Sequence, residues 1–145
     1  MLKSFWFWIV VASISMQFFS LNVPAKVSIN SSNEIQAPKE ITTILKRSCY
    51  DCHSFDVKEP WYYTIAPVSW FVQNHIKNAR EVLNFSEWNS YSSKKQLKVI
   101  DRLPKAIVIR MPMPSYLWLH PEANLSIVEK KLLTDWAEEL KDKIK

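Results

Sequence analysis

The sequence contains no glycine, and this absence argues against several classes of enzyme. None of its 145 residues is Gly. A Walker P-loop, a GxGxxG dinucleotide-binding turn and a GxSxG nucleophile elbow each need backbone conformations that glycine alone adopts readily. Nucleotide-dependent and hydrolase chemistry built on these motifs is therefore not expected.

Cysteine is also scarce, while apolar and aromatic residues are not. Two cysteines in 145 residues are too few for a disulfide scaffold. A hydrophobic content of 48% and an aromatic content of 13% are too high for a disordered chain. The composition predicts one small globular domain.

The charge is mildly basic and lacks the clustering of a nucleic-acid-binding protein. There are 19 basic and 14 acidic residues, a formal net charge of +5. The lysines are spread along the chain, with short doublets at Lys94-Lys95 and Lys130-Lys131 instead of one basic arm or stripe. We therefore expect a solvated basic surface and no nucleic-acid partner.

The N-terminus reads as an export segment. After Lys3 no charged residue occurs before Lys26. A basic start followed by an apolar stretch is typical of a signal peptide, for which residues 23–25 (Val-Pro-Ala) offer a cleavage site, and of an uncleaved anchor. Both alternatives for residues 1–25 place the rest of the chain outside the cytoplasm. Residues 26–37 are polar and predict a linker, which leaves 38–145 as the folded domain.

The motif that carries chemistry is Cys49-Tyr50-Asp51-Cys52-His53. It matches Cys-x-x-Cys-His, the attachment sequence for c-type haem. Two thiols three residues apart lie on one face of a helical turn, where both can form thioethers with one haem, and the next residue brings an imidazole to the iron. We therefore predict one haem c per chain, bound covalently through Cys49 and Cys52, with His53 as axial ligand.

Three other interpretations of the two cysteines stay open on the sequence alone. A thioredoxin-like dithiol would need a strand context, whereas the residues before Cys49 have a helical pattern. A zinc site would need a fourth ligand, for which His75 and His120 are available. A plain disulfide would leave His53 without a role.

Four residues are candidates for the sixth iron ligand. Met111 and Met113 lie in Met111-Pro-Met-Pro114, where the prolines restrict the backbone. In polyproline II geometry the two methionines would point in different directions, so we expect one of them, Met111, to be the ligand. Met113, His75 and His120 are the alternatives.

The remaining sequence predicts helices and no strands. One helix begins at Pro38 and carries Ile41, Ile44, Leu45, Cys49 and Cys52 on one face. A second follows Pro67, with its apolar stripe at Val68, Phe71, Val72, His75, Ile76 and Ala79. A third begins near Ser93 and is kinked or ended by Pro104. The last follows a capping box, Ser126-x-x-Glu129. Asn84, Asn89 and Asn124 are expected in left-handed positions that glycine would otherwise take.

Several segments together resemble the bacterial haem-binding domain family of small cytochrome c-like proteins. They are residues 47–54, 65–70 (Ile-Ala-Pro-Val-Ser-Trp), 83–88 (Leu-Asn-Phe-Ser-Glu-Trp) and 111–126. The resemblance covers residues 35–140. It implies an all-α, cytochrome c-like domain behind an N-terminal hydrophobic segment, with haem bound through Cys49, Cys52 and His53 and a Met-Pro ligand at Met111. Family members carry glycine where this chain has Ala79 and Ile109-Arg110.

These observations predict a c-type cytochrome that transfers single electrons, with no enzymatic activity. The alternative is a haem-based gas or peroxide sensor, or a peroxidase-like enzyme, with a labile sixth ligand. The expected partners are redox proteins, the cytochrome c maturation machinery and, through the N-terminus, the cytoplasmic membrane. The expected location is the periplasmic side of the bacterial inner membrane.

Two further groups of residues are expected to contact the haem. Four tryptophans are expected to shield it from water: Trp70, Trp88, Trp118 and Trp136. Three arginines are expected to pair with its propionates: Arg47, Arg80 and Arg110.

Overall fold

The computed structural model describes residues 2–19 and 31–145, and it is all-α in this part of the chain. The longer helices are α1 (Leu2–Met16), α2 (Lys39–Ser48), α4 (Val68–Val82), α5 (Ser93–Ile100), α6 (Leu103–Ile109) and α8 (Ile127–Ile144). The short ones are η1 (Ser31–Asn33), α3 (Tyr50–His53), η2 (Trp61–Tyr63), η3 (Phe85–Ser90), α7 (Pro114–Leu117) and η4 (Pro121–Ala123). The all-α part of the expected fold class is confirmed for the described residues.

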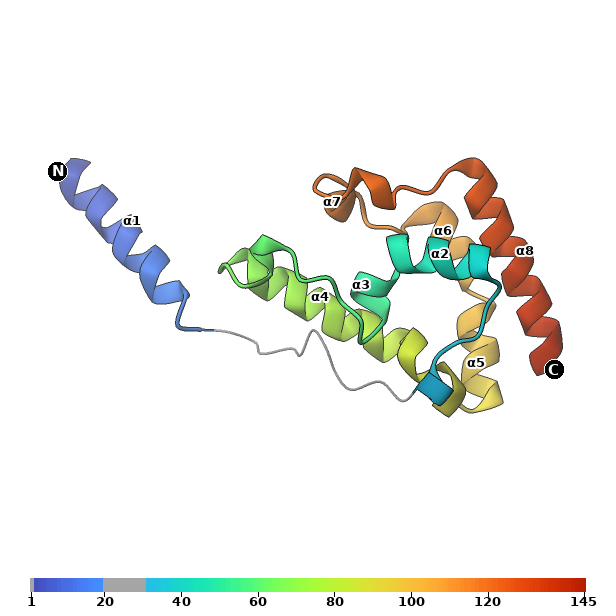
Figure 1. The fold of residues 1–145 in the computed structure, drawn as a ribbon. Helices are drawn as coiled ribbons and strands as arrows, with labels where there is room; N and C mark the ends of the chain where they lie inside the picture. Colours follow the sequence, from blue (N-terminus) through green and yellow to red (C-terminus); the bar gives the residue numbers. More distant parts are fainter. Residues whose placement is uncertain (1, 20–30) are drawn as a thin grey trace.

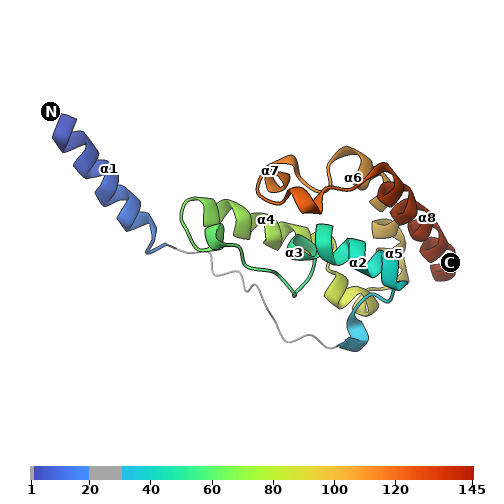
Figure 2. The ribbon, with the colours of Figure 1, turned by 45° about the horizontal axis from the view of Figure 1, so that its top comes forward.

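The domain has two groups of helices joined by α2. On one side α3 packs against α4, and on the other α5 and α6 pack against α8, while α2 contacts both α3 and α8 (Figure 1). After rotation of the view, α6, α7 and α8 lie along one edge, with α2, α3 and α4 beside them (Figure 2). The α2–α3 junction therefore lies at the centre of the domain.

The main hydrophobic core lies between α2 and α8. Ile41, Ile44 and Leu45 recur at helical spacing on α2 and are buried. They belong to the same cluster as Leu133 and Trp136 on α8. The predicted apolar face of this first helix is thus confirmed, and it fixes the orientation of the segment that leads into Cys49.

The helix that was expected to run from Pro38 through Cys52 is divided into two. Pro38 is the residue before α2, which ends at Ser48, and α3 begins at Tyr50. Cys49 between them has φ −130° and ψ −34°, outside the helical region. The expectation of one continuous helix is wrong because 3.6-residue periodicity continues across a change of backbone direction that the pattern alone does not reveal.

The buried face of α4 also differs from the prediction. Val68 and Phe71 are 46% and 61% exposed, whereas Ser69 and Gln73 are buried beside Ile76 and Ala79. Gln73 reaches this position because its Nε2 donates to the Tyr63 carbonyl of η2, at 3.0 Å. This hydrogen bond to the chain packed against the helix satisfies the Gln73 amide nitrogen, while its Oε1 is buried without a hydrogen-bond partner among the described residues. A polar side chain thus occupies a place where periodicity predicts an apolar one.

The boundaries around α5, α6 and α8 agree better with the sequence. The break predicted at Pro104 occurs just before it, since α5 ends at Ile100 and α6 has Pro104 in its first turn. The capping box predicted for α8 is present between Ser126 and Glu129. These features depend on residues within one helical turn of each other.

The asparagines expected in left-handed conformations do not adopt them. Asn84 has φ −126°, Asn124 has φ −64°, and Asn89 lies within the 3-10 helix η3. Asn84 is instead the N-cap of η3, where its Oδ1 accepts a hydrogen bond from the Ser86 amide at 3.1 Å. Its role is capping, which is the commoner use of asparagine before a helix.

The N-terminal region extends away from the rest of the domain. Helix α1 projects to one side (Figure 1). It carries four exposed aromatic residues, Phe5, Trp6, Phe7 and Trp8. Its end contacts the chain before α4, where the Gln17 side chain bonds to both backbone groups of Ala66. Among residues 2–19 and 31–145, no helix is both long enough and apolar enough to cross a membrane.

The packed domain includes residues that precede Pro38. Ile35 is 6% exposed, belongs to the main core and donates its amide hydrogen to the Phe85 carbonyl at 2.9 Å. The end of the segment predicted as a linker is therefore part of the folded unit, and residues 20–30 lie outside the described part of the chain.

Candidate functional site

The Cys-x-x-Cys-His motif forms the turn that follows α2. The Cys49 amide donates to the Leu45 carbonyl, which completes the last turn of α2. The Cys49 carbonyl then accepts from the amides of Cys52, at 3.2 Å, and His53, at 3.0 Å. One helical turn therefore holds both thiols and the imidazole near the centre of the domain.

The ring of His53 is held by the backbone that follows α4. His53 Nδ1 lies 2.9 Å from the carbonyl oxygen of Leu83. Since a carbonyl oxygen only accepts hydrogen bonds, Nδ1 carries the proton, and burial lowers the pKa of the ring so that the neutral form is favoured. The lone pair of Nε2 is thereby left for an external partner, as in histidines that ligate metals.

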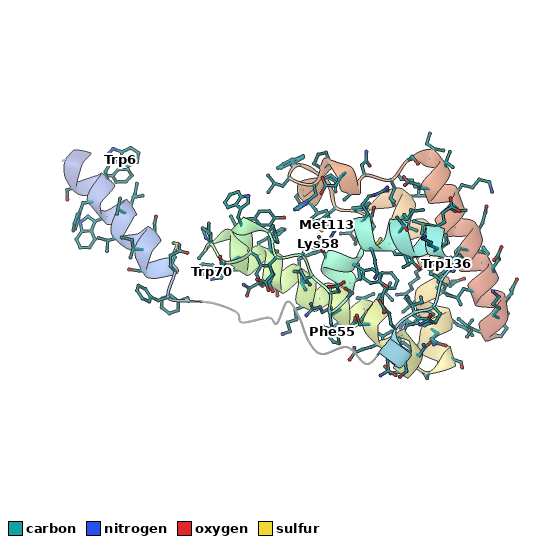
Figure 3. All side chains as sticks on the ribbon, in the orientation of Figure 1. Trp6, Phe55, Lys58, Trp70, Met113 and Trp136 are labelled. Atoms are coloured by element: carbon teal, nitrogen blue, oxygen red, sulfur yellow. The ribbon has the colours of Figure 1, made fainter. Side chains whose placement is uncertain are left out.

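His53 lies at the meeting point of two cavities. The smaller is lined by both cysteines of the motif and by two histidines and two methionines: His53, His75, Met111 and Met113. In Figure 3 the labelled Met113 lies between the segment leading to α7 and the α2–α3 junction. Residues from α3, α4 and the segment after α6 thus converge on one cavity.

The larger cavity has a volume of about 390 Å³ and adjoins the smaller one at Cys49, His53 and Met111. Its walls are largely aliphatic, with contributions from Val82, Leu83, Val99, Leu103, Ala106 and Ile107. A cavity of this volume with apolar walls and a few converging polar groups is typical of a cofactor site.

The chemistry of the two thiols does not resemble that of a redox-active dithiol. Both cysteines are free, and burial raises the pKa of Cys49 to about 12 and that of Cys52 to about 11. Redox-active Cys-x-x-Cys pairs have depressed thiol pKa values instead. The zinc alternative also lacks support, because the described residues contain no group of three or more His, Cys, Asp or Glu side chains placed to hold a metal ion.

Three of the four candidates for the sixth ligand line the smaller cavity. Met111 follows α6, where its amide donates to the Ala106 carbonyl at 2.9 Å, and Met113 precedes α7. The two methionines were expected to diverge, yet both line the smaller cavity, and Met111 lines both cavities. His75 joins them from α4, with its ring stacked on Phe71.

His120 is placed elsewhere and is occupied by other partners. Its Nε2 lies 2.6 Å from the Tyr62 hydroxyl oxygen, and its Nδ1 lies 3.2 Å from Glu122 Oε1. Its ring stacks on Tyr116 at a centroid distance of 4.3 Å. His120 lines neither of the two cavities, so the structure does not support it as an iron ligand.

Comparison with known proteins shows the family to which this chain belongs. The family model described as a haem-binding domain matches residues 10–139. The chain belongs to the haem-binding domain family. No curated protein and no solved structure gives a match. The matched region begins within α1 and ends within α8, so it includes every element that lines the two cavities.

The residues of this haem-binding domain fit the cofactor. A haem needs an imidazole whose orientation is fixed, an apolar slot for the macrocycle and polar groups for its propionates. His53 with its Nδ1 bonded to Leu83 supplies the first, and the aliphatic cavity supplies the second. The donor set of the site therefore agrees with the family.

The tryptophans do not wall the haem site as expected. Trp88 and Trp136 belong to the main core, Trp118 is 83% exposed, and Trp70 donates from Nε1 to the Phe19 carbonyl. In Figure 3 the labelled Trp136 lies on the side of α8 that faces the other helices. None of the four lines either cavity. Sequence gives the number of aromatic residues, whereas packing decides which surface each one covers.

The arginines named as propionate partners do not line the two cavities, although each lies near a residue that does. Arg47 Nη2 lies 2.7 Å from Glu129 Oε1, and Arg80 Nε donates to the Ser54 carbonyl. Neither these two nor Arg110 lines either cavity. Burial raises the pKa of Cys49 and of Cys52, and the charges of Arg47 and Arg80 respectively lower these pKa values in part. Burial and then the charge of Arg110 lower the pKa of His75. The cations that do line the larger cavity are Lys95, Lys98 and Arg102. Their spacing of three and four residues was the signal in the sequence that could have identified them.

Proposed function

We propose that this haem-binding protein is a monohaem c-type cytochrome that carries single electrons between redox partners on the periplasmic side of the bacterial inner membrane. The observation that carries the proposal is the meeting of Cys49, Cys52, His53 and Met111 at one cavity. The all-α fold, in which α2 delivers the motif to the domain centre, supports a cytochrome c-like architecture.

The two thiols have a defined covalent role in this proposal. Each thiol would add across one vinyl group of the haem: its S–H bond would break, a C–S bond would form, and its hydrogen would go to the other vinyl carbon. Such an addition would consume no oxidant or reductant and lose no atoms. Both cysteines line the smaller cavity and come from one turn, which supports attachment to a single haem per chain.

The remaining residues would bind and tune the cofactor, whose iron supplies the one-electron redox couple. His53 would ligate through Nε2, because its Nδ1 is bonded to Leu83. Met111 would supply the thioether of the sixth position, which raises the reduction potential relative to a second histidine. The aliphatic wall would exclude water from the macrocycle.

Electron transfer is favoured over a sensor or peroxidase role by the ligands available at the site. Met111, Met113 and His75 all line the cavity that His53 enters, so a sixth ligand is at hand. A six-coordinate iron suits electron transfer, whereas gas or peroxide binding needs an open or labile position. In this proposal the protein catalyses no reaction, binds no nucleic acid, and has redox proteins, the maturation machinery and the membrane as partners.

The proposal is tested by intact mass under denaturing conditions. The wild-type chain is produced in a bacterium with an active cytochrome c maturation system and exported to the periplasm. The single variants Cys49→Ser and Cys52→Ser and the double variant are produced in the same way. We expect the wild type to retain the mass of one haem and the double variant to retain none. A wild-type chain that carries no covalent haem while a control cytochrome c from the same cells is loaded would contradict the proposal.

A further inference from the structure

The larger cavity has a distinct basic end. It is lined by Lys95, Lys98 and Arg102, and by one carboxylate, that of Glu81. Cys52 does not line this cavity, and none of the three cations lines the smaller one. The cations therefore lie beyond the region that the two cavities share, at the end away from Cys52.

The three cations share one face of the chain that leads from α5 to α6. Lys95 and Lys98 are three residues apart on α5. Arg102 lies between α5 and α6, where its amide donates to the Val99 carbonyl at 3.1 Å, and it lines the same cavity as the two lysines. The Lys95 ammonium lies 3.5 Å from the centroid of the Tyr91 ring, which holds it at the rim.

Two of these cations are available for a ligand. Among the residues that the structure describes, neither Lys98 nor Arg102 makes a hydrogen bond or an ion pair through its side chain. Both are exposed at the surface end of the cavity, where a charged group of a bound molecule would meet solvent. Lys94 and Lys105 are neighbouring exposed lysines that do not line the cavity.

The geometry points to Lys98 and Arg102, with Lys95 at the rim, as the binding site for the two carboxylates of the haem propionates. This inference rests on the proposed function. The vinyl groups of haem lie on the edge opposite to the propionates, so attachment at Cys49 and Cys52 directs the carboxylates away from the cysteines. Arg102 presents a guanidinium suited to paired hydrogen bonds with a carboxylate, and Lys98 presents a point charge.

The site has a consequence for the redox couple. A cation near the haem stabilises the reduced state, which carries one positive charge fewer, and it balances the propionate charge. We expect Lys98→Gln/Arg102→Gln to lower the equilibrium constant for reduction at least threefold. At 59 mV per tenfold change for one electron, this is a decrease of about 28 mV in the reduction potential.

The test compares this double variant with the matched double variant Lys94→Gln/Lys105→Gln, which removes the same charge from neighbouring surface positions. Each protein is produced as the covalently loaded, full-length chain, and its potential is measured by spectroscopic redox titration. Redox-difference infrared spectra report the carboxylate bands of the propionates. We expect both the potential and these bands to change in the cavity variant and to stay near wild type in the control.

A charge-conserving variant separates binding from structure. Lys98→Arg/Arg102→Lys should keep the wild-type potential, because both cations remain. Equal shifts in the cavity and control variants, or unchanged propionate bands in the cavity variant, would overturn the inference. The intact mass of every sample is measured to distinguish failure of this inference from failure of the proposed function. A wild-type chain without covalent haem contradicts the proposed function itself.

Discussion

At the scale of single residues, the site depends on contacts that fix side chains before any ligand is bound. His53 is oriented by a hydrogen bond to Leu83, which lies 30 residues further along the chain. Cys49 is aligned by its backbone, which ends α2 and opens α3. Met111, which is far from the Cys-x-x-Cys-His motif in the sequence, lines both cavities together with Cys49 and His53.

The choice among sixth ligands gives a prediction at this scale. Met111→Leu keeps the side-chain volume and removes the sulfur, so we expect a folded, haem-loaded protein that loses the near-infrared charge-transfer band of a methionine–iron bond. Its reduction potential should fall, because the thioether favours the reduced iron. Absorption spectra and redox titration measure both effects.

Met113→Leu is the matched control for this prediction, since Met113 lines only the smaller cavity. The control should keep the band and the potential. Loss of the band in Met113→Leu together with its retention in Met111→Leu would reverse the assignment. Absence of the band from the wild type, with a spectral change on replacing His75, would assign the ligand to His75.

At the scale of elements, α8 is fixed by its first turn. Glu129 Oε2 accepts from the Ser126 amide at 2.9 Å, and the Ser126 hydroxyl accepts from the Glu129 amide. Glu129 Oε1 also accepts from Arg47, which ties the start of α8 to the end of α2. The cap was predictable from four residues, whereas the pair with Arg47 joins residues 82 apart in sequence.

This cap gives a prediction about pH and stability. The Ser126 amide and then Arg47 lower the pKa of Glu129 below its usual 4.5. A carboxylate with a lowered folded-state pKa stabilises the protein above its unfolded pKa, and that contribution is lost as the pH falls through the folded value. Glu129→Ala should therefore reduce the free energy of unfolding by about 1 kcal/mol at pH 7. The difference from wild type should shrink at pH 3.5.

Urea unfolding of the loaded protein, followed by circular dichroism at both pH values, measures this effect. Glu139→Ala makes the same substitution at an exposed position of α8 and should change stability little. A Glu129→Ala deficit that is equally large at pH 3.5 would show that the charge of the carboxylate is not its source.

At the scale of the whole molecule, α1 is set apart from the haem-binding core. Its aromatic residues Phe5, Trp6, Phe7 and Trp8 are exposed, and its end is bonded to the chain before α4 through Gln17 and Ala66. A helix that exposes so much apolar surface needs a partner that covers it. We propose that this partner is the cytoplasmic membrane.

Cell fractionation tests the proposed attachment. We expect the full-length chain in the membrane fraction with residues 1–25 still present by intact mass. A variant in which a cleavable signal peptide replaces residues 1–25 should appear in the soluble periplasmic fraction and carry haem. If the unaltered chain is expressed but a soluble protein without residues 1–25 is recovered, the segment is a cleaved signal peptide and the proposed anchor is wrong.

The sequence by itself determined the kind of fold and the local arrangement of the Cys-x-x-Cys-His motif. Cys49, Cys52 and His53 lie in one helical turn, and the Ser126 capping box and the break before Pro104 are equally local, so short patterns suffice to predict them. Tertiary structure alone decided which surfaces these elements present. It brought Leu83 to His53, placed Met111 and His75 at one cavity, and turned Arg47 to Glu129. It also buried Gln73 in place of Phe71 and put Lys98 and Arg102, not the expected arginines, at the cavity end. These outcomes depend on packing between residues far apart in the chain, and no local periodicity encodes that packing.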